Sequence, residues 1–221
     1  MQASEFIDHQ VPVLKKTDVV GTALSWMEEL RVDALPVTDC RKFLGFVDQE
    51  VLEELPNSLE TLDQVPLENS SCWVIEGKHL YDLLGVAYTH HSKWVAVVDR
   101  NMQYLGVVPI EKAIETIVKD LSAHIEGSVL SLSMQIKEYQ LSEIARLVES
   151  ENAKILSCLV SSNPIDSTAI EVIIKLDKVD VRHIKATLER FGYRVREYFR
   201  EDAAISTEEE RIGNLLRFLD I

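Results

Sequence analysis

Two copies of one pattern, both in the first half of the chain, constrain its fold most strongly. In the first copy, residues 35–39 (Leu-Pro-Val-Thr-Asp) are followed by a short turn and residues 43–47 (Phe-Leu-Gly-Phe-Val). In the second copy, residues 95–99 (Val-Ala-Val-Val-Asp) are followed by a turn and residues 104–108 (Tyr-Leu-Gly-Val-Val). Each copy predicts a strand, a hairpin turn that starts at an aspartate, and a second strand entered through a glycine. The sequence therefore indicates a tandem structural repeat.

The repeat extends on both sides of each hairpin. Apolar residues at helical spacing precede it at residues 20–27 and 80–87, and helices are expected after it at 49–55 and 110–118. We expect Thr17 and Asp18 to cap the first of these helices. With an apolar strand in front (residues 11–14 or 72–75), each copy reads β-α-β-β-α. A unit this small buries too little surface to be stable alone, so we expect the two copies to pack sheet to sheet and share a core.

The second half of the chain shows a different order of elements. Strands are expected at residues 128–134, 154–160, 169–176 and 193–199, with one helix after Gln140 and another between Asp180 and Gly192. The order β-α-β-β-α-β predicts a ferredoxin-like fold. The tail has a capping box at residues 206–209 (Ser-Thr-Glu-Glu). It also has an apolar stripe made of Ile212, Leu215, Leu216 and Leu219.

These patterns predict an α+β chain of three parts, at residues 1–118, 119–201 and 202–221. The last part is expected to be an amphipathic helix. Because an isolated helix of this length is marginal in water, we expect it to dock on its own chain or on a partner subunit.

The composition narrows the partners and the compartment. The net charge is −14, from 37 acidic and 23 basic side chains, which disfavours nucleic acids and anionic membranes. The first residues show no secretory signal, and the longest apolar stretches are far too short to cross a membrane. The three cysteines are widely spaced, which favours reduced thiols and a cytoplasmic location.

The residues of the repeat resemble those of a known family. The pattern is similar to the cystathionine-beta-synthase (CBS) domain. It consists of a capped helix, then Leu-Pro-Val-x-Asp, then a turn, then Leu-Gly followed by two apolar residues. Two copies resemble the paired CBS module, over about residues 1–118, although Ala96 stands where the second copy should have proline. The second half resembles an ACT domain. Together with residues 139–149, this combination is similar to CBS proteins related to the acetoin utilisation protein B family.

The resemblance implies a ligand cleft between the copies, which in many regulators binds adenosine nucleotides. The family's motif is glycine, two apolar residues, Thr or Ser, two further residues and Asp. Its hydroxyl helps to hold a phosphate, and its aspartate binds the ribose hydroxyls. Here Asp48 and Val51 stand at these two positions in the first copy, and Pro109 and Lys112 in the second. Both copies therefore lack the two ligand-binding groups.

The candidate ligand-binding residues follow from the position of this cleft. They are Thr17, Asp33, Ala34, Leu35, Pro36, Asp48, Lys93, Trp94, Val95 and Lys112. In ACT domains, a turn that contains a glycine binds the carboxylate of the ligand. Here the corresponding turn, residues 136–140, has no glycine, and it carries an acidic residue, Glu138. The adjacent His90 and His91 point in different directions on a helix or a strand, so we expect no metal site there.

No nucleophile–base constellation, Walker loop or dinucleotide-binding motif is found in the sequence. We therefore expect a non-catalytic, cytoplasmic regulatory and oligomerisation protein. It is expected to form a homodimer or higher homo-oligomer, with a degenerate nucleotide site that serves as a scaffold or as a sensor of a small ligand. No cofactor is firmly predicted, and an adenosine nucleotide is the candidate. One alternative is a genuine sensor of an adenosine nucleotide or an amino acid. The other is an enzyme whose site is formed by residues distant in sequence.

Overall fold

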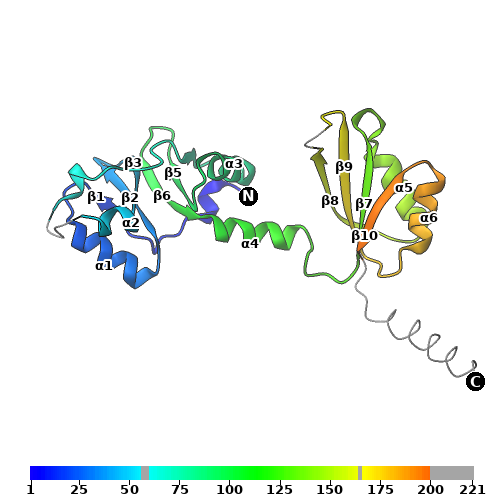
Figure 1. Ribbon diagram of the computed structural model, residues 1–221, viewed down its shortest axis with the longest axis horizontal. Coiled ribbons are helices and arrows are strands. Elements are labelled where there is room, and N and C mark those ends of the chain that lie inside the picture. Colours follow the sequence, from blue (N-terminus) through cyan, green and yellow to red (C-terminus); the bar gives the residue numbers. More distant parts are fainter. Residues whose placement is uncertain (56–59, 164–165, 200–221) are drawn as a thin grey trace, which may run out of the picture. The chain divides into compact units, whose positions relative to one another are not determined.

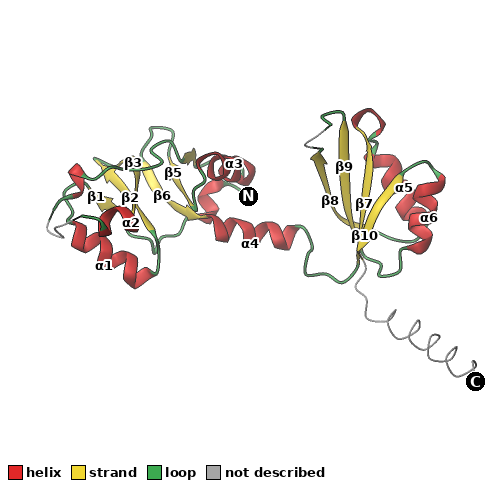
Figure 2. Ribbon diagram, viewed as in Figure 1, coloured by secondary structure: helices red, strands yellow, loops and turns green. Residues whose placement is uncertain are grey.

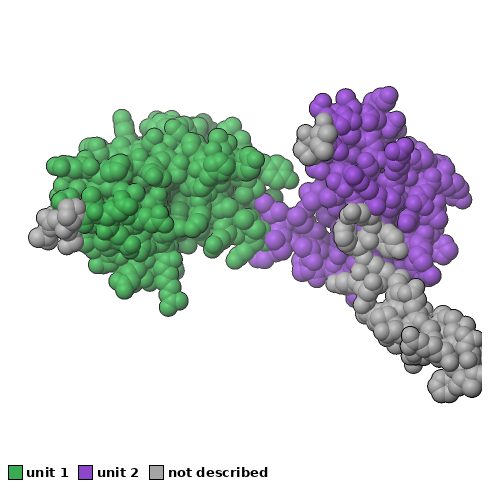
Figure 3. All heavy atoms as spheres, viewed as in Figure 1, with its two compact units in different colours: residues 1–116 green, residues 117–221 purple. Residues whose placement is uncertain are grey.

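The computed structural model describes residues 1–55, 60–163 and 166–199. It divides the chain into two compact units, residues 1–116 and 117–221 (Figure 3). Both units contain helices and strands, so the chain is α+β (Figures 1 and 2). The domain edges expected at residues 118 and 201 stay predictions.

The first repeat forms a three-stranded sheet with two helices. Its elements are β1 (Leu14–Lys15), α1 (Val20–Leu30), β2 (Ala34–Asp39), β3 (Lys42–Asp48) and α2 (Gln49–Glu53). The sheet order is β1-β2-β3. Strands β1 and β2 are parallel, and the hairpin β2–β3 is antiparallel.

The second repeat has the same architecture. Its elements are β4 (Trp73–Ile75), α3 (Leu80–His90), β5 (Trp94–Val98), β6 (Tyr104–Pro109) and α4 (Ile110–Asp120). The sheet order is β4-β5-β6, with β4 parallel to β5 and β6 antiparallel to it. The predicted β-α-β-β-α order is therefore confirmed in both copies. Even the helix ends agree, because Arg31 and His91, at equivalent positions of the two repeats, both end their helices in the left-handed conformation.

The segments that lead into the repeats are exchanged between them. Short 3-10 helices, η1 (Ala3–Phe6) and η2 (Leu62–Gln64), lie in these segments. In the segment leading into the second repeat, Glu68 pairs with Phe46 of the first through two backbone hydrogen bonds of 2.8 Å. In the segment leading into the first repeat, the Asp8 amide donates to the Val107 carbonyl of the second at 2.8 Å. Each repeat thus completes the sheet edge of the other, which the sequence did not reveal.

Apolar packing joins the repeats as well. Leu62 and Val65, which lie ahead of the second repeat, are buried in the hydrophobic core of the first. Phe43 and Tyr104, at equivalent positions of the two hairpins, stack with ring centroids 6.2 Å apart. Most of β2 and nearly all of β5 are buried on both faces of the strand. The two copies therefore depend on each other for burial, and the expected sheet-to-sheet packing around one shared core stays a prediction.

The predicted cap of the first helix is wrong. Helix α1 begins at Val20, its N-cap residue is Val19, and no side chain caps it. The Asp18 carboxylate instead accepts a hydrogen bond of 2.8 Å from the Lys15 amide, so it stabilises the turn ahead of the helix. The strand expected at residues 11–14 is reduced to Leu14–Lys15.

The second unit has the order β-α-β-β-α-β that the sequence predicts. Its elements are β7 (Ser128–Gln135), α5 (Leu141–Ser150), β8 (Ile155–Ser162), β9 (Ala169–Leu176), α6 (Arg182–Arg190) and β10 (Arg194–Phe199). The strands form one antiparallel sheet in the order β10-β7-β9-β8. The first and third strands lie in the middle, as in a ferredoxin-like fold. The capping box and apolar stripe of residues 206–221 lie outside the described residues.

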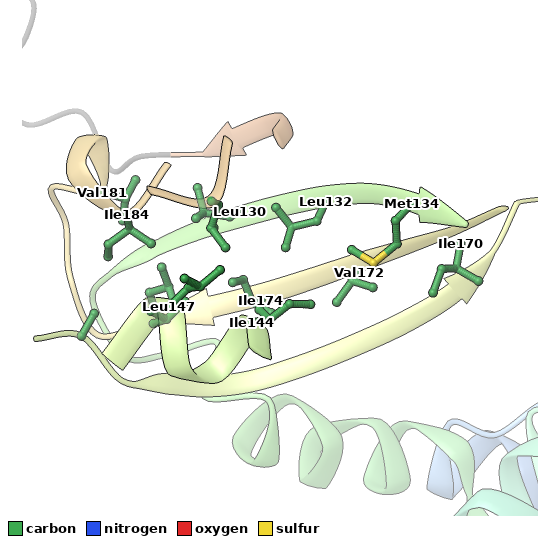
Figure 4. Close-up of a cluster of buried hydrophobic side chains, with 14 residues drawn as sticks. Leu130, Leu132, Met134, Ile144, Leu147, Ile170, Val172, Ile174, Val181 and Ile184 are labelled. Atoms are coloured by element: carbon green, nitrogen blue, oxygen red, sulfur yellow. The ribbon is translucent and has the colours of Figure 1, made fainter. Parts of the chain in front are cut away.

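The core of this unit lies between one face of the sheet and the two helices (Figure 4). Alternate residues of β7 and β9, such as Leu132 and Val172, are fully buried, as the half-buried strand pattern requires. The helices contribute Ile144, Leu147 and Ile184 to the same cluster.

The close approach of the exchanged segment to β3 gives a testable prediction. Gly45 has φ +150°, and a Cβ there would lie 2.6 Å from the Glu68 carbonyl oxygen. We expect Gly45→Ala to lower the free energy of unfolding by about 2 kcal/mol in urea titrations, because it strains the backbone and displaces residue 68. Gly77→Ala is the matched control, since no atom lies within 4 Å of its added Cβ. A Gly45 variant as stable as this control would contradict the role given to the exchange.

Candidate functional site

A cleft of about 910 Å³ lies in the first unit, where the ends of three helices meet. Its volume suits a small ligand. Residues at the C-terminal ends of α1 and α3, at the start of α4 and in the segment of residues 8–11 line it. The lining residues with apolar side chains include Val11, Leu30, Val32, Leu84, Ile110 and Ile114, and the charged ones are Asp8, Arg31, Asp33, Lys93 and Glu111.

An ion pair between equivalent positions of the two repeats lies at this cleft. Asp33 directly precedes β2, and Lys93 directly precedes β5, the central strand of the other repeat. The Lys93 ammonium pairs with the Asp33 carboxylate. The Trp94 indole nitrogen also donates to Asp33, at 3.3 Å. The pseudo-twofold relation between the repeats therefore brings a cation and an anion together.

The environment of Asp33 favours its ionised form. Burial by itself would raise its pKa, but the hydrogen bonds from Lys93 and Trp94 and the charge of Lys93 hold the pKa below its usual value. The pKa of Lys93 is raised by the same pair. Both groups are largely exposed, so the pair is open to solvent and to an entering ligand.

Asp48 lies in the opposite electrostatic environment. It ends β3 opposite Ala34 and directly precedes α2. Burial, a hydrogen bond with Glu68 and the negative charges of Glu68, Asp33 and Glu50 raise its pKa to about 6. Asp48 and Glu68 therefore form a carboxyl pair that holds a proton more tightly than an isolated aspartate does.

The structure brings three of the predicted ligand-binding residues together, Asp33, Lys93 and Trp94, which all line the cleft. Thr17 lines a separate hollow of about 500 Å³, next to Lys15 and Tyr104. The Lys112 ammonium donates to the Ile7 carbonyl at 3.3 Å and is not among the lining residues. Asp48 lies in the carboxyl pair, and four further residues are buried in the central strands: Ala34, Leu35, Pro36 and Val95. A ligand-binding role for these residues stays a prediction.

Several lining residues were missed by the sequence reasoning. Tyr88 on α3, with 81% of its surface exposed, and Ile114 on α4, with 48%, both line the cleft. Arg31 and His91, the equivalent left-handed helix ends, line it too. The repeat itself was a signal that could have identified Arg31 and His91. They occupy equivalent positions of the two repeats, as Asp33 and Lys93 do.

A metal site is not evident at the paired histidines. His90 is the last residue of α3, and His91 is its left-handed C-cap. Within residues 1–55, 60–163 and 166–199, no three His, Cys, Asp or Glu side chains are grouped so that they could hold a metal ion.

The carboxyl pair gives a prediction about pH. Since the folded-state pKa of Asp48 is about 6 against 3.8 for the free group, ionising Asp48 costs stability as the pH rises between these values. Asp48→Asn should therefore raise the free energy of unfolding at pH 7.5 by about 1 kcal/mol, a value already reduced for solvent screening. The gain should vanish below pH 4. Urea unfolding at several pH values measures it, and Asp120→Asn controls for the loss of one carboxyl. A gain that does not depend on pH would contradict the assignment.

Comparisons with known proteins concern the fold. No protein-family model matches the chain. A CBS domain pair/ACT domain protein from Thermotoga maritima is similar in structure, with a TM-score of 0.50 and 22% identity over 55% of this chain and 99% of that one. The CBS domains of a transcriptional regulator from Streptococcus pneumoniae match with a TM-score of 0.47 and 20% identity, over 52% of this chain and 98% of that one. CBSX2 in complex with AMP matches with a TM-score of 0.46 and 19% identity, over 53% and 96%. The likeness to the Thermotoga maritima protein shows that about half of this chain has the fold of a CBS-domain pair.

Proposed function

We propose that this chain is a non-catalytic regulatory protein that senses a small ligand in the cleft between its two repeats. The observation that carries the proposal is the cleft itself, because its lining comes from both repeats. A ligand there would contact both repeats at once and would compete with or reinforce the Asp33–Lys93 pair. Such a ligand stabilises the state in which the cleft has its observed form.

The charges argue for a ligand site that departs from the usual nucleotide site. Lys112 is engaged by the Ile7 carbonyl, and Asp48 is paired with Glu68. The cleft also carries three carboxylates, those of Asp8, Asp33 and Glu111, against two cations, Arg31 and Lys93, so the balance of charge disfavours a phosphate. A ligand with an apolar body and few negative charges suits this lining. The alternative is that the cleft still binds an adenosine nucleotide, as the resemblance to paired CBS modules implies. An adenosine nucleotide is therefore the first ligand to test.

The second unit is proposed to be an ACT-like module. Its strand order and its two helices on one face support this assignment. A hollow of about 700 Å³ next to the turn at residues 136–138 is where an amino acid would be tested. We also propose that the chain is related to the acetoin utilisation protein B-like group and that it resides in the cytoplasm. Three free thiols, Cys40, Cys72 and Cys158, are compatible with a reducing compartment. No helix among the described residues is long and apolar enough to cross a membrane.

A ligand screen with a matched pair of variants tests the cleft. A ligand present at one hundred times its dissociation constant stabilises the native state by about 2.7 kcal/mol, so thermal melting should shift by several degrees. Adenosine, AMP, ATP and the amino acids form the panel. Ile114→Arg should abolish the shift because the new side chain fills the cleft, whereas Val118→Arg should retain it. Both residues are about half exposed on α4, but only Ile114 lines the cleft. No shift with any compound, or equal shifts in both variants, would contradict the proposal.

A scaffold that assembles into a homodimer is the second candidate, and the surface of α3 favours it. Tyr81 and Tyr88 are 74% and 81% exposed, and Gly85 between them leaves open space where a partner helix could approach. Exposed aromatic side chains of this kind are typical of interfaces.

Sedimentation or light scattering tests this candidate. Tyr81→Glu should weaken the dimer at least tenfold, while an acid in the first turn of α3 keeps the helix intact. Lys119→Glu, at the end of α4, is the control for the change in charge. A monomeric wild-type protein at 100 µM, or a Tyr81→Glu variant that dimerises normally, would eliminate the scaffold.

A further inference from the structure

The second unit exposes an aromatic ring that lies near two cations. Phe191 follows the last residue of α6, and 48% of its surface is exposed. The guanidinium carbons of Arg146 and Arg190 each lie 5.6 Å from the centroid of its ring. Neither guanidinium forms an ion pair with any residue in the described part of the chain. A guanidinium that lies near a ring in this way can still donate hydrogen bonds through its N–H groups.

Two more cations lie beside this ring. Lys137 and Arg194 line the hollow of about 700 Å³ to which Phe191 also contributes. The carboxylates of this hollow already have donors. Glu138 accepts from the Gln135 amide at 3.2 Å, and Glu143 accepts from the Tyr193 hydroxyl at 3.1 Å. We call the surface formed by Lys137, Arg146, Arg190, Phe191 and Arg194 the basic surface.

The basic surface lies in a stretch of the chain that carries little net charge. The whole protein has a net charge of −14, yet residues 128–196 contain ten basic and nine acidic side chains, a net charge of +1. The segment that follows β10 is acidic again. Residues 200–221 contain six acidic and three basic side chains, including three successive acids at 208–210, and so carry −3.

We propose that the basic surface binds the C-terminal segment of the same chain, residues 201–221. Carboxylates at Glu208, Glu209 and Glu210 would accept hydrogen bonds from the Arg146 and Arg190 guanidiniums, a strong and geometrically specific pairing. The apolar stripe that begins at Ile212 would cover the exposed ring of Phe191 and nearby apolar side chains. Leu141, at the start of α5, is 43% exposed, and Ile136, next to Lys137, is 61% exposed.

The length of the connection permits this docking within one molecule. The segment leaves β10 at Phe199, whereas the basic surface includes Arg194 at the other end of the same strand. The five steps along this strand span about 17 Å. The stretch from Phe199 to Glu208 can reach about 30 Å, which is sufficient to return to Arg194. A tether this short gives the segment a millimolar effective concentration, so even weak contacts keep it bound.

Hydrogen–deuterium exchange of the full chain, read by mass spectrometry, tests the proposal. Residues 206–221 of the wild type should exchange more slowly than the same peptide free in solution. The double variant Arg146→Glu with Arg190→Glu should raise their exchange at least fivefold. Adding Glu208→Arg, Glu209→Arg and Glu210→Arg to this variant should restore the protection, because the charges are then exchanged rather than lost. Lys178→Glu, at an exposed lysine ahead of α6, controls for the loss of positive charge and should change nothing.

Each other result overturns the proposal. Wild-type exchange equal to that of the free peptide means that the segment does not dock. Protection that survives the double charge reversal places the segment elsewhere. Protection that grows with protein concentration between 1 and 100 µM assigns the docking to a second copy of the chain. None of these readouts depends on a ligand in the cleft of the first unit, so this inference and the proposed function stand or fall separately.

Discussion

The exchange of leading segments between the two repeats is the constraint on which the first unit depends. Each three-stranded sheet would otherwise present an unpaired edge and an incomplete core. The backbone pairing of Glu68 with Phe46, and of Asp8 with Val107, closes those edges by the same device in both directions. Leu62 and Val65 then supply apolar surface that the first repeat lacks by itself. Two repeats that are each too small to be stable alone become one structure in this way.

The same pseudo-symmetry determines what the cleft can do. It brings equivalent positions together, and where these differ in charge, as Asp33 and Lys93 do, the two repeats attract each other at the site. The exchanged segment also brings two acids together, Asp48 and Glu68. The Asp48 carboxyl therefore favours its protonated form, and its ionisation lowers the stability of the fold. The repeats are thus alike in backbone and unlike in charge. This divergence places both acidic and basic side chains in the cleft.

The sequence predicted the architecture far better than the site. Strand β9 was predicted to the residue, and all the main helices and strands of the repeats were expected, because alternation and helical spacing are local signals. The cap at Thr17 and Asp18 failed because the Asp18 carboxylate has a closer partner in the Lys15 amide. The exchange of segments could not be seen, since residues 1–8 and 60–69 have no regular pattern and gain their partners only in the folded chain. Tyr88 and Ile114 were missed because a helical pattern can indicate that a residue is on the surface of a helix. It does not indicate that this surface lines a cleft in the folded chain.

The central claim is that the two repeats form a single cooperative structure because each completes the other. Native-state hydrogen exchange of the full chain tests it directly, through the amides of Phe46 and Asp8, which donate across the exchange in opposite directions. The account predicts that both amides exchange only when the whole unit opens. The two amides should have the same free energy of opening as the amides of β2 and β5. In dilute urea, this free energy should fall by the same amount for the amides of Phe46, Asp8, β2 and β5. Two distinct opening free energies, one for each repeat, would contradict it.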